Sequence, residues 1–590
     1  MPLFSRLLDL FSWSMDERPS RQRIPRLWVP SVLLLAICLV QAGLSPAASK
    51  ATVGEQGLAP IRSYIAASWD TLTRSMTKCD TVVDPKLAER SILYLPADFP
   101  APPAVAQIRK KCNVQVEHLP VVITGPGQVD PAKLGAPGLL YLENSYVVPG
   151  GRFNEMYGWD SYFIIRGLLA DGRIDKARAM VENFFFEIEH YGTILNANRT
   201  YFLTRSQPPF LTSEILGVYE AQKATGHEDR AWLEKAYGYA AKDYEMWNRE
   251  PHLAGSTGLS RYYDFGNGPA PEAIKDESGF HRKVAAYALL HPDWGRNYLV
   301  ADNAQPVVGF QYSVQVCDAT QTMAKSECEP SQNVSLNADY YKGDRAMRES
   351  GFDVSSRFGP FGAATHHFAP VCLNSLLYKY ETDMGQISQI LGKTDDAKKW
   401  SQRAADRKAK IQKYLWDAER GLFVDYNFES QVRSSYEYIT TFYPLWAGLA
   451  SPEQAQALVR NLSIFEQAGG LAMSHTESGA QWDYPYAWAP TQLLAIEGLR
   501  RYGFNDDANR VSYKFLSMIA ENFRRDGTIK EKYNAVTRSS ETQVSAGYHM
   551  NVVGFGWTNG VFLELLHALP QDWRERLAKE QGSRQNVAAR

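Results

Sequence analysis

The pattern of apolar and polar residues predicts helices along much of the chain. Between Asp395 and Trp416 apolar residues recur at helical spacing, at Ala397, Trp400, Ala404, Ala405, Ile411, Tyr414 and Leu415. A helix with this spacing has one apolar face, which packs on a core. Residues 506–523 show the same spacing. We therefore predict long amphipathic helices in both places.

Five short segments repeat a signal that ends one helix and starts the next. They begin at Gly172, Gly226, Gly392, Gly448 and Gly503. Glycine adopts the left-handed conformation that ends a helix, and Asp, Asn or Ser a few residues later caps the following one. We expect helix starts near Asp175, Asp229, Asp395, Ser451 and Asp506.

The spacing of these signals indicates a repeated unit. The intervals are 54, 166, 56 and 55 residues, and 166 is close to three times 55. A unit of this length made of two helices is typical of an array of helical hairpins, which can close into a ring. A chance recurrence of common capping residues is the alternative. Residues 255–348 lack the repeat, so we expect long loops and insertions at the ring mouth.

The first 49 residues have the order of an export signal. Arginines between positions 18 and 26 precede an apolar run at residues 27–44, and small residues follow it. This order is typical of a signal peptide and predicts a periplasmic or secreted protein. A retained N-terminal anchor is the alternative, although the run is slightly short for a bilayer span. Once the signal is removed, we expect no stable membrane span.

Composition narrows the classes of function. The chain is 45% hydrophobic and 22% charged with a formal net charge of −2, which is an ordinary globular balance. Without a basic surplus, we expect no nucleic-acid partner. Aromatic residues make up 12% of the chain. Such rings suit a sugar-binding cleft because a pyranose has apolar faces, although most of them are expected in the core.

The cysteines predict little special chemistry. Cys317 and Cys328 are close in sequence and form the best candidate disulfide, which export would permit. Cys372 lies in an apolar stretch and is expected to be a buried free thiol. The sequence has no CxxC or HExxH motif, so we expect neither a metal nor a cofactor.

Two segments concentrate aromatic and charged side chains. Residues 149–162 place Arg152, Trp159 and Asp160 after a Gly-Gly turn, and residues 481–490 combine an acid with rings and prolines. Stacking on tryptophan, with hydroxyl groups held by acids and guanidinium groups, is a usual way to bind a sugar. A structural polar corner is the alternative. Further carboxylates stand beside basic or aromatic residues, where a structural ion pair is the commoner explanation.

These segments resemble the trehalases, glycoside hydrolase family 37. Residues 149–162 fit the first signature of that family, and residues 481–490 fit the second, in the right order. Further similar blocks lie at residues 205–210, 351–357, 531–533 and 554–561. The resemblance covers residues 80–570 approximately. It implies an all-α fold, an (α/α)6 toroid built from helical hairpins, with loop insertions at the rim.

The resemblance also implies roles for individual residues. The general acid of the family matches Asp353, and its general base matches Glu531. Its sugar contacts match Arg152, Trp159, Asp160, Asn196, Arg205, Ser206, Gln207, Glu272 and Gly351. An inverting glycosidase holds its two carboxyl groups about 6.5–9.5 Å apart, which leaves room for a water. Because Asp353 must hold a proton near neutral pH, we expect an enclosed site or another carboxylate beside it.

Three positions depart from the family pattern. Ala270 stands where an arginine is usual, and Phe352 where tryptophan is usual. The lid of the family corresponds to residues 539–553 of this chain, and Tyr548 stands where that lid has a glutamate. A rebuilt lid that still acts on trehalose is one interpretation. A changed leaving-group site for a different small α-glucoside is the other. Glu541 and His549 are candidates to fill the gap.

The sequence therefore predicts an inverting α-glucoside hydrolase, first of all an α,α-trehalase acting on a small disaccharide. A non-catalytic sugar-binding protein is disfavoured because both carboxylates are kept. We expect a signal peptide or anchor over residues 1–49 and a lead packing on the barrel over 50–145. The catalytic domain should span 146–570 and a polar tail 571–590. We also expect a monomer.

Overall fold

Helices start where the glycine and cap pattern predicts them. The computed structural model describes residues 53–84, 90–272, 279–300, 310–315, 331–548 and 550–588. The helices that follow the five signals are α5 (Ile174–His190), α7 (Arg230–Trp247), α13 (Thr394–Tyr414), α15 (Pro452–Arg460) and α17 (Asn505–Asp526). Each begins within one residue of its predicted start, so the predicted starts are confirmed.

The glycine part of the pattern holds at all five helices, and the cap part holds at two. All five glycines are left-handed, with φ values of 71°, 79°, 78°, 76° and 84° in chain order. Asp229 caps α7 by accepting a hydrogen bond from the backbone of Trp232 at 2.9 Å. Ser451 and Gln454 form a reciprocal capping box at the start of α15. The N-cap residues of α5, α13 and α17 are Arg173, Lys393 and Phe504, which make no side-chain cap hydrogen bond, so capping by Asp175, Asp395 and Asp506 was predicted wrongly.

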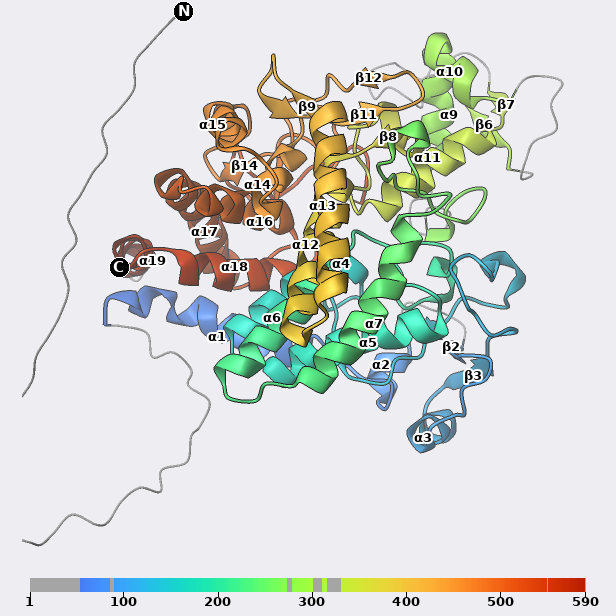
Figure 1. The fold of residues 1–590 in the computed structure, drawn as a ribbon, viewed down its shortest axis with the longest axis horizontal. Coiled ribbons are helices and arrows are strands. Elements are labelled where there is room, and N and C mark those ends of the chain that lie inside the picture. Colours follow the sequence, from blue (N-terminus) through green and yellow to red (C-terminus); the bar gives the residue numbers. More distant parts are fainter. Residues whose placement is uncertain are drawn as a thin grey trace, which may run out of the picture. The chain divides into compact units, whose positions relative to one another are not determined.

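A second set of helices forms a ring inside the first. It consists of α4 (Gly158–Ala170), α6 (Leu211–Ala224), α12 (Val371–Leu391), α14 (Tyr443–Ala447), α16 (Ala489–Arg501) and α18 (Gly556–Ala568). Successive members contact each other, and α18 contacts α4, so the ring is closed. Each inner helix is followed along the chain by an outer one, of which α19 (Gln571–Ala588) is the last. The predicted (α/α)6 toroid is confirmed (Figure 1).

The ring closes at a contact between two glycines. A Cβ atom on Gly167 of α4 would lie 2.3 Å from the Cα of Gly560 in α18. One on Gly560 would lie 2.1 Å from the carbonyl oxygen of Phe163. Only glycine lets two backbones approach this closely. The contact brings the first turns of both helices together, and the rings of Trp159 and Trp557 lie 5.7 Å apart there.

The insertion between residues 255 and 348 contains more regular structure than predicted. Its described parts include α9 (Phe280–Leu290), α10 (Pro292–Tyr298), α11 (Ala338–Glu349), β6 (Tyr312–Val314) and the antiparallel β7 (Gln332–Val334). They pack around a small core of their own, which includes Val284, Tyr340 and Met347. The expectation of long loops missed these helices because they do not follow the glycine and cap repeat.

The residues before the ring pack against it. Helix α1 (Ala59–Thr71) contacts α18, and β1 (Thr73–Arg74) pairs with β5 (Tyr146–Val147). A parallel sheet has the order β3 (Val114–His118), β2 (Ser91–Leu95), β4 (Leu139–Leu140), with α3 (Pro103–Lys111) between two of its strands in sequence.

A disulfide joins two helices of this lead. Cys79, the first residue of α2 (Cys79–Val82), is bonded to Cys112 at the end of α3. The sequence did not predict this pair, and its candidate pair, Cys317 and Cys328, lies outside the described residues. Cys372 is buried and free, as predicted.

The C-terminal helix returns to the N-terminal lead. Residues 571–588, which the sequence suggested as a polar tail, form α19. This helix contacts α17 and η1 (Val53–Leu58), and Arg574 forms an ion pair with Glu55 at 3.1 Å. The first and last described elements therefore lie side by side.

Short antiparallel strand pairs occupy loops between helices. They are β8 (Phe368–Ala369) with β11 (Tyr426–Asn427) and β12 (Val432–Arg433), β9 (Trp416–Asp417) with β10 (Leu422–Phe423), β13 (Glu466–Gln467) with β14 (Gly470–Leu471), and β15 (Tyr486–Trp488) with β16 (Lys532–Asn534).

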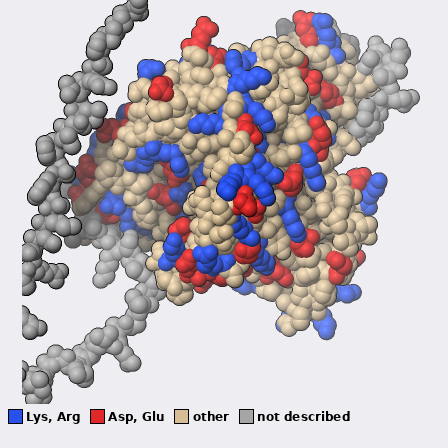
Figure 2. All heavy atoms as spheres, in the orientation of Figure 1, with Lys and Arg blue, Asp and Glu red and all other residues tan. Residues whose placement is uncertain are grey.

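On the surface, acidic and basic side chains are interspersed over the face in Figure 2. None of the described helices has the length and apolarity needed to cross a bilayer.

Substitution of Gly167 should show how much the helix contact contributes to the free energy of unfolding, apart from the effect of alanine on helix propensity. Gly167→Ala should lower the free energy of unfolding by about 1–3 kcal/mol, because the added methyl group meets the backbone of α18. Gly238→Ala in α7 is the matched control, since a Cβ there meets nothing within 4 Å. It should stabilise the helix by up to about 1 kcal/mol. Urea unfolding measures both, and equal stability of the two variants would contradict the role of the contact.

Candidate active site

A single cavity collects nearly all the predicted site residues. It has a volume of about 900 Å³, the size of a small-molecule site, and lies where α4 and α18 begin. Ten of the eleven predicted residues line it: Arg152, Trp159, Asp160, Asn196, Arg205, Gln207, Glu272, Gly351, Asp353 and Glu531. Ser206 does not line it, because its hydroxyl donates a hydrogen bond to the carbonyl oxygen of Ile194 at 2.6 Å.

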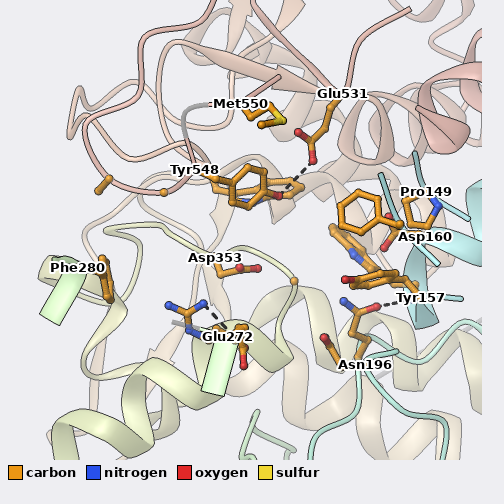
Figure 3. A pocket seen from close by; sticks show the side chains of 18 of the residues that line it. Pro149, Tyr157, Asp160, Asn196, Glu272, Phe280, Asp353, Glu531, Tyr548 and Met550 are labelled. Carbon is orange, nitrogen blue, oxygen red and sulfur yellow. Dashed lines mark hydrogen bonds and ion pairs between the residues drawn. The ribbon is translucent and has the colours of Figure 1, made fainter. Parts of the chain in front are cut away.

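The first turn of α4 brings a ring and a carboxyl group into the cavity. The backbone N–H of Trp159 donates to Oε1 of Gln207 at 2.9 Å, which satisfies a free helix-start amide and orients that side chain. Gly351 is left-handed, with φ 77°, and a Cβ there would lie 2.8 Å from the indole of Trp159. Glycine is therefore needed at position 351 for the loop to pass over the ring. Asp160 follows directly and points into the cavity in Figure 3.

A buried network of arginines and carboxylates forms another wall. Arg205 forms an ion pair with Glu272 and lies 3.8 Å from Asp264. Nη1 of Arg348 lies 3.9 Å from Glu272. Arg345 pairs with Asp264 at 2.9 Å and also donates to three backbone carbonyls of the preceding loop. The loop that carries Glu272 is thus held in place by buried, charge-assisted hydrogen bonds.

The loop of Asp353 is fixed by the second signature segment. Nε2 of Gln481 donates to the backbone carbonyl of Asp353 at 2.6 Å. The buried carboxylate of Asp483 accepts from Oγ of Ser355 at 2.6 Å and from the backbone of Ser356 at 2.8 Å. The acid of this segment, which the sequence suggested as a binding group, instead supports the loop of the predicted general acid.

Glu531 is buried in the same cavity with its two oxygens in different surroundings. Oε1 accepts a hydrogen bond from the hydroxyl of Tyr548 at 3.2 Å (Figure 3). None of the described residues hydrogen-bonds to Oε2, which lies 4.0 Å from Nζ of Lys532. An oxygen of this kind is available to a water or a substrate group.

Four carboxyl groups line the cavity, and besides the paired Glu272 they are Asp160, Asp353 and Glu531, of which Asp160 and Glu531 have raised pKa values. Burial, followed by the charges of Glu531 and Asp353, raises the pKa of Asp160 well above its usual range. Burial also raises the pKa of Glu531, while the charge of Lys532 and the hydrogen bond from Tyr548 oppose that rise. Ionising all three at once is costly, so the cavity favours holding a proton. An acid and base pair requires this condition.

Two basic residues line the cavity that the sequence analysis did not predict as site residues. Ala270 is buried and does not line the cavity. Arg348 and Lys283 do line it, and Lys283 donates to the backbone carbonyl of Ser545 in the lid at 3.4 Å. Arg348 precedes a family-like block by one helical turn, which is a signal that could have found it. Lys283 lies in α9 of the insertion, which neither the helix repeat nor the family-like blocks cover.

The structure does not place either Glu541 or His549, the two candidates to replace the missing lid glutamate, in the cavity. Glu541 is exposed and does not line the cavity. His549 lies outside the described residues. Met550 does line the cavity, and its sulfur lies 3.6 Å from Nη1 of Arg152. Tyr548 therefore supplies the polar group of the described lid that reaches Glu531.

One group of the described residues has donor atoms close enough for a metal ion, and it lies away from the cavity. Asp339, in the first turn of α11, is 2.9 Å from Nε2 of His366 and 3.4 Å from Nε2 of His367. Arg261 donates to the backbone carbonyl of His366 at 2.9 Å, which places a cation beside the group. A carboxylate at a helix start is also stabilised by the helix dipole, so hydrogen bonding from the histidines to Asp339 accounts for the group.

The fold and cavity together define a class of protein. A closed toroid of helical hairpins surrounds a sugar-sized cavity that contains two separately held carboxyl groups, aromatic rings and arginines. This arrangement is that of a glycoside hydrolase, in which one carboxyl group donates a proton and the other activates water.

Comparison with known proteins identifies the family. A trehalase family model matches residues 61–570, and the chain belongs to the trehalase family. A probable trehalase of Eremothecium gossypii is 37% identical over 556 residues, covering 84% of this chain and 70% of that protein. A cytosolic neutral trehalase of Saccharomyces cerevisiae is 36% identical over 554 residues, covering 84% and 69%. The solved structure of neutral trehalase Nth1 from Saccharomyces cerevisiae has 33% identity and a TM-score of 0.70, covering 88% and 96%.

The predicted periplasmic or secreted location is wrong on this comparison. Relatives in Emericella nidulans and Saccharomyces cerevisiae, matched over 568 and 554 residues, are named cytosolic neutral trehalases. Residues 1–49, which suggested export, lie outside the described residues. A basic, apolar and small-residue order is a short compositional pattern. Similarity over most of the chain outweighs it.

The raised pKa of Glu531 predicts the acidic side of the pH profile. If this carboxylate must be ionised to act, kcat/KM should fall as the pH drops through its folded-state pKa. That limb should lie above the ordinary glutamate value of about 4.3. The measurement is kcat/KM on trehalose from about pH 3 to about pH 8, with the stability of the fold checked separately at each pH. A limb at or below about 4.3 would contradict the assignment.

Proposed function

We propose that this protein hydrolyses α,α-trehalose to two glucose molecules with inversion at the attacked carbon. The observation that supports it most is the pair of carboxyl groups, Asp353 and Glu531, in one cavity of a trehalase-family chain. Relatives matched over most of the chain are named trehalases.

The mechanism assigns one role to each carboxyl group. Asp353 gives its proton to the glycosidic oxygen as the bond from that oxygen to the anomeric carbon breaks. Glu531 takes a proton from a water through Oε2, to which none of the described residues hydrogen-bonds, as the water oxygen bonds to the opposite face of the same carbon. One ring leaves as β-glucose and the other as α-glucose. A proton leaves Asp353 and one arrives at Glu531, so exchange with solvent resets the pair.

The remaining lining residues are proposed as sugar contacts. Trp159 offers an apolar face, while Asp160, Arg205 and Gln207 offer hydrogen-bonding groups to ring hydroxyls. Arg152, Asn196, Glu272 and Gly351 complete this set. Ser206 is better placed to support the segment that carries its neighbours, because its hydroxyl is bonded to the backbone.

The alternative substrate, another small α-glucoside, is not favoured. It was based on the missing arginine at position 270 and the missing lid glutamate at 548. Arg348 and Lys283 still bring positive charge to the cavity wall, and Tyr548 brings a hydroxyl group. The rebuilt lid is therefore the better interpretation of both departures.

The substrate assignment has a direct test. We expect kcat/KM on trehalose of about 10⁴ M⁻¹s⁻¹ or more, within the usual range for enzymes. Other α-linked glucose disaccharides, such as maltose, should be cleaved far more slowly. Glucose release from a substrate panel measures this, and a preference for another disaccharide would restore the alternative.

Substitution of the two carboxyl groups tests the roles. Asp353→Asn and Glu531→Gln should each lower kcat by about 10² or more, the usual scale for loss of general acid or base catalysis. With α-glucosyl fluoride, whose leaving group needs little protonation, Asp353→Asn should recover much of its rate while Glu531→Gln should not. The reverse pattern would exchange the roles. Near-normal turnover of trehalose by either variant would remove that residue from the mechanism.

The stereochemistry of the reaction can be observed directly. Proton NMR of the earliest product should show α-glucose and β-glucose in equal amounts, before mutarotation. A retaining enzyme would release α-glucose alone, which would exclude the mechanism proposed here.

We also propose that residues 146–570 form the catalytic domain and that the active unit is a monomer. All cavity-lining residues that the structure describes lie within this range of one chain. Size-exclusion chromatography with light scattering should give about the chain mass of 66.4 kDa for the active fraction. Activity that elutes only with a dimer would contradict the monomer.

A further inference from the structure

The lid contacts Glu531 and the following residue, Lys532, at several points. The backbone N–H of Glu531 donates to the carbonyl of Val552 at 3.0 Å. The side chain of Asn551 accepts from the backbone of Lys532 at 3.2 Å and donates back to its carbonyl at 2.8 Å. Nζ of Lys532 donates to the carbonyl of Tyr548 at 3.1 Å. Residues 531–532 are therefore held by lid residues 548–552.

The same contacts reach the general acid. Nζ of the buried Lys532 also donates to Oε1 of Gln481 at 2.8 Å, and Nε2 of Gln481 donates to the carbonyl of Asp353 at 2.6 Å. The ring of Tyr548 lies 4.4 Å from Nζ of Lys532, within cation–π range. One chain of interactions thus connects the lid, the segment of Glu531 and Lys532, and the loop that carries Asp353.

The two oxygens of Glu531 are distinguished by this arrangement. Tyr548 donates to Oε1, while Oε2 is buried without a hydrogen-bond partner among the described residues. A carboxylate held at one oxygen cannot rotate freely, so its second oxygen keeps a fixed direction. We propose that Tyr548 is a positioning residue for the base: its hydroxyl fixes Oε1 of Glu531 so that Oε2 faces the attacking water.

This inference rests on the proposed roles of the carboxyl groups. It also explains why the departure at position 548 is compatible with activity. A glutamate there would add another carboxylate next to Glu531, and it could only accept hydrogen bonds when ionised. Tyrosine donates instead, which stabilises the ionised form that a base must have.

Other charged groups act on Glu531 from the surrounding elements. Lys532, the next residue and the first of β16, and Arg152 from the loop before α4 favour its ionised form. Asp160 of α4 lies close enough for its own pKa to be raised by the charge of Glu531, and so disfavours that form. Asp353 acts on Asp160 in the same way. Tyr548→Phe changes none of these side chains and keeps the ring next to Lys532, so this variant isolates the effect of the hydroxyl.

Tyr548→Phe removes the hydroxyl and keeps the ring over Lys532. With trehalose as substrate, we expect the acidic limb of kcat/KM to move upward by about one pH unit, since a hydrogen bond to the ionised form is lost. We expect kcat at the optimum to fall about tenfold, with little change in KM. Tyr548→Glu should move the limb further in the same direction, because a second negative charge opposes ionisation.

The matched control is Tyr486→Phe. The hydroxyl of Tyr486 donates to the backbone carbonyl of Gln543 in the lid segment, and this side chain does not line the cavity. Loss of this lid hydroxyl should leave the pH limb where it is. Thermal unfolding of both variants shows whether either change has disturbed the fold.

Two results would overturn the inference. A raised KM with an unmoved limb and unchanged kcat would make Tyr548 a substrate contact instead. A pH profile of Tyr548→Phe that coincides with that of the parent protein would show that the hydroxyl does not position Glu531. Failure of the proposed function is seen separately, as a parent protein that does not hydrolyse trehalose. The same limb would then be measured on the α-glucoside that the parent does hydrolyse.

Discussion

The close approach of α4 and α18 at Gly167 and Gly560 is the contact on which the rest of the structure depends. It joins the last inner helix to the first, converting a row of hairpins into a ring. It also places the first turns of these helices together, and both turns line the cavity. A larger residue at either glycine would separate Trp159 from Trp557 as well as loosen the core. The same packing contact therefore closes the ring and sets the geometry of the site.

Two kinds of buried charge surround the cavity. Arg205, Arg345, Asp264 and Glu272 are paired, so their charges are compensated and they form a rigid wall. The cavity also contains carboxyl groups that repel one another, and burial together with the charges of Glu531 and Asp353 raises the pKa of Asp160. A buried ion pair costs desolvation and adds little net stability. The paired groups therefore contribute to the geometry of one wall more than to the stability of the fold.

The sequence predicts local features and family blocks well, and contacts between distant segments poorly. Helix starts such as α13 after Gly392 follow from a short signal that acts within a few residues. The cavity residues follow from the signatures. The bond between Tyr548 and Glu531, and the disulfide between Cys79 and Cys112, depend on how segments meet in space, which no local pattern encodes. The helices α9 to α11 were missed because they do not follow the repeat. The export prediction failed because it used composition alone.

The closure of the ring between α4 and α18 has a consequence for how the molecule responds to a cut in its backbone. A linear array of hairpins has two end repeats and can lose them one at a time. In a ring every hairpin has two neighbours, so removing one breaks two interfaces at once. A single cut in an exposed loop between hairpins would then leave both pieces bound within the same closed circle. The nicked protein should migrate as one particle in native gels and separate only in denaturant.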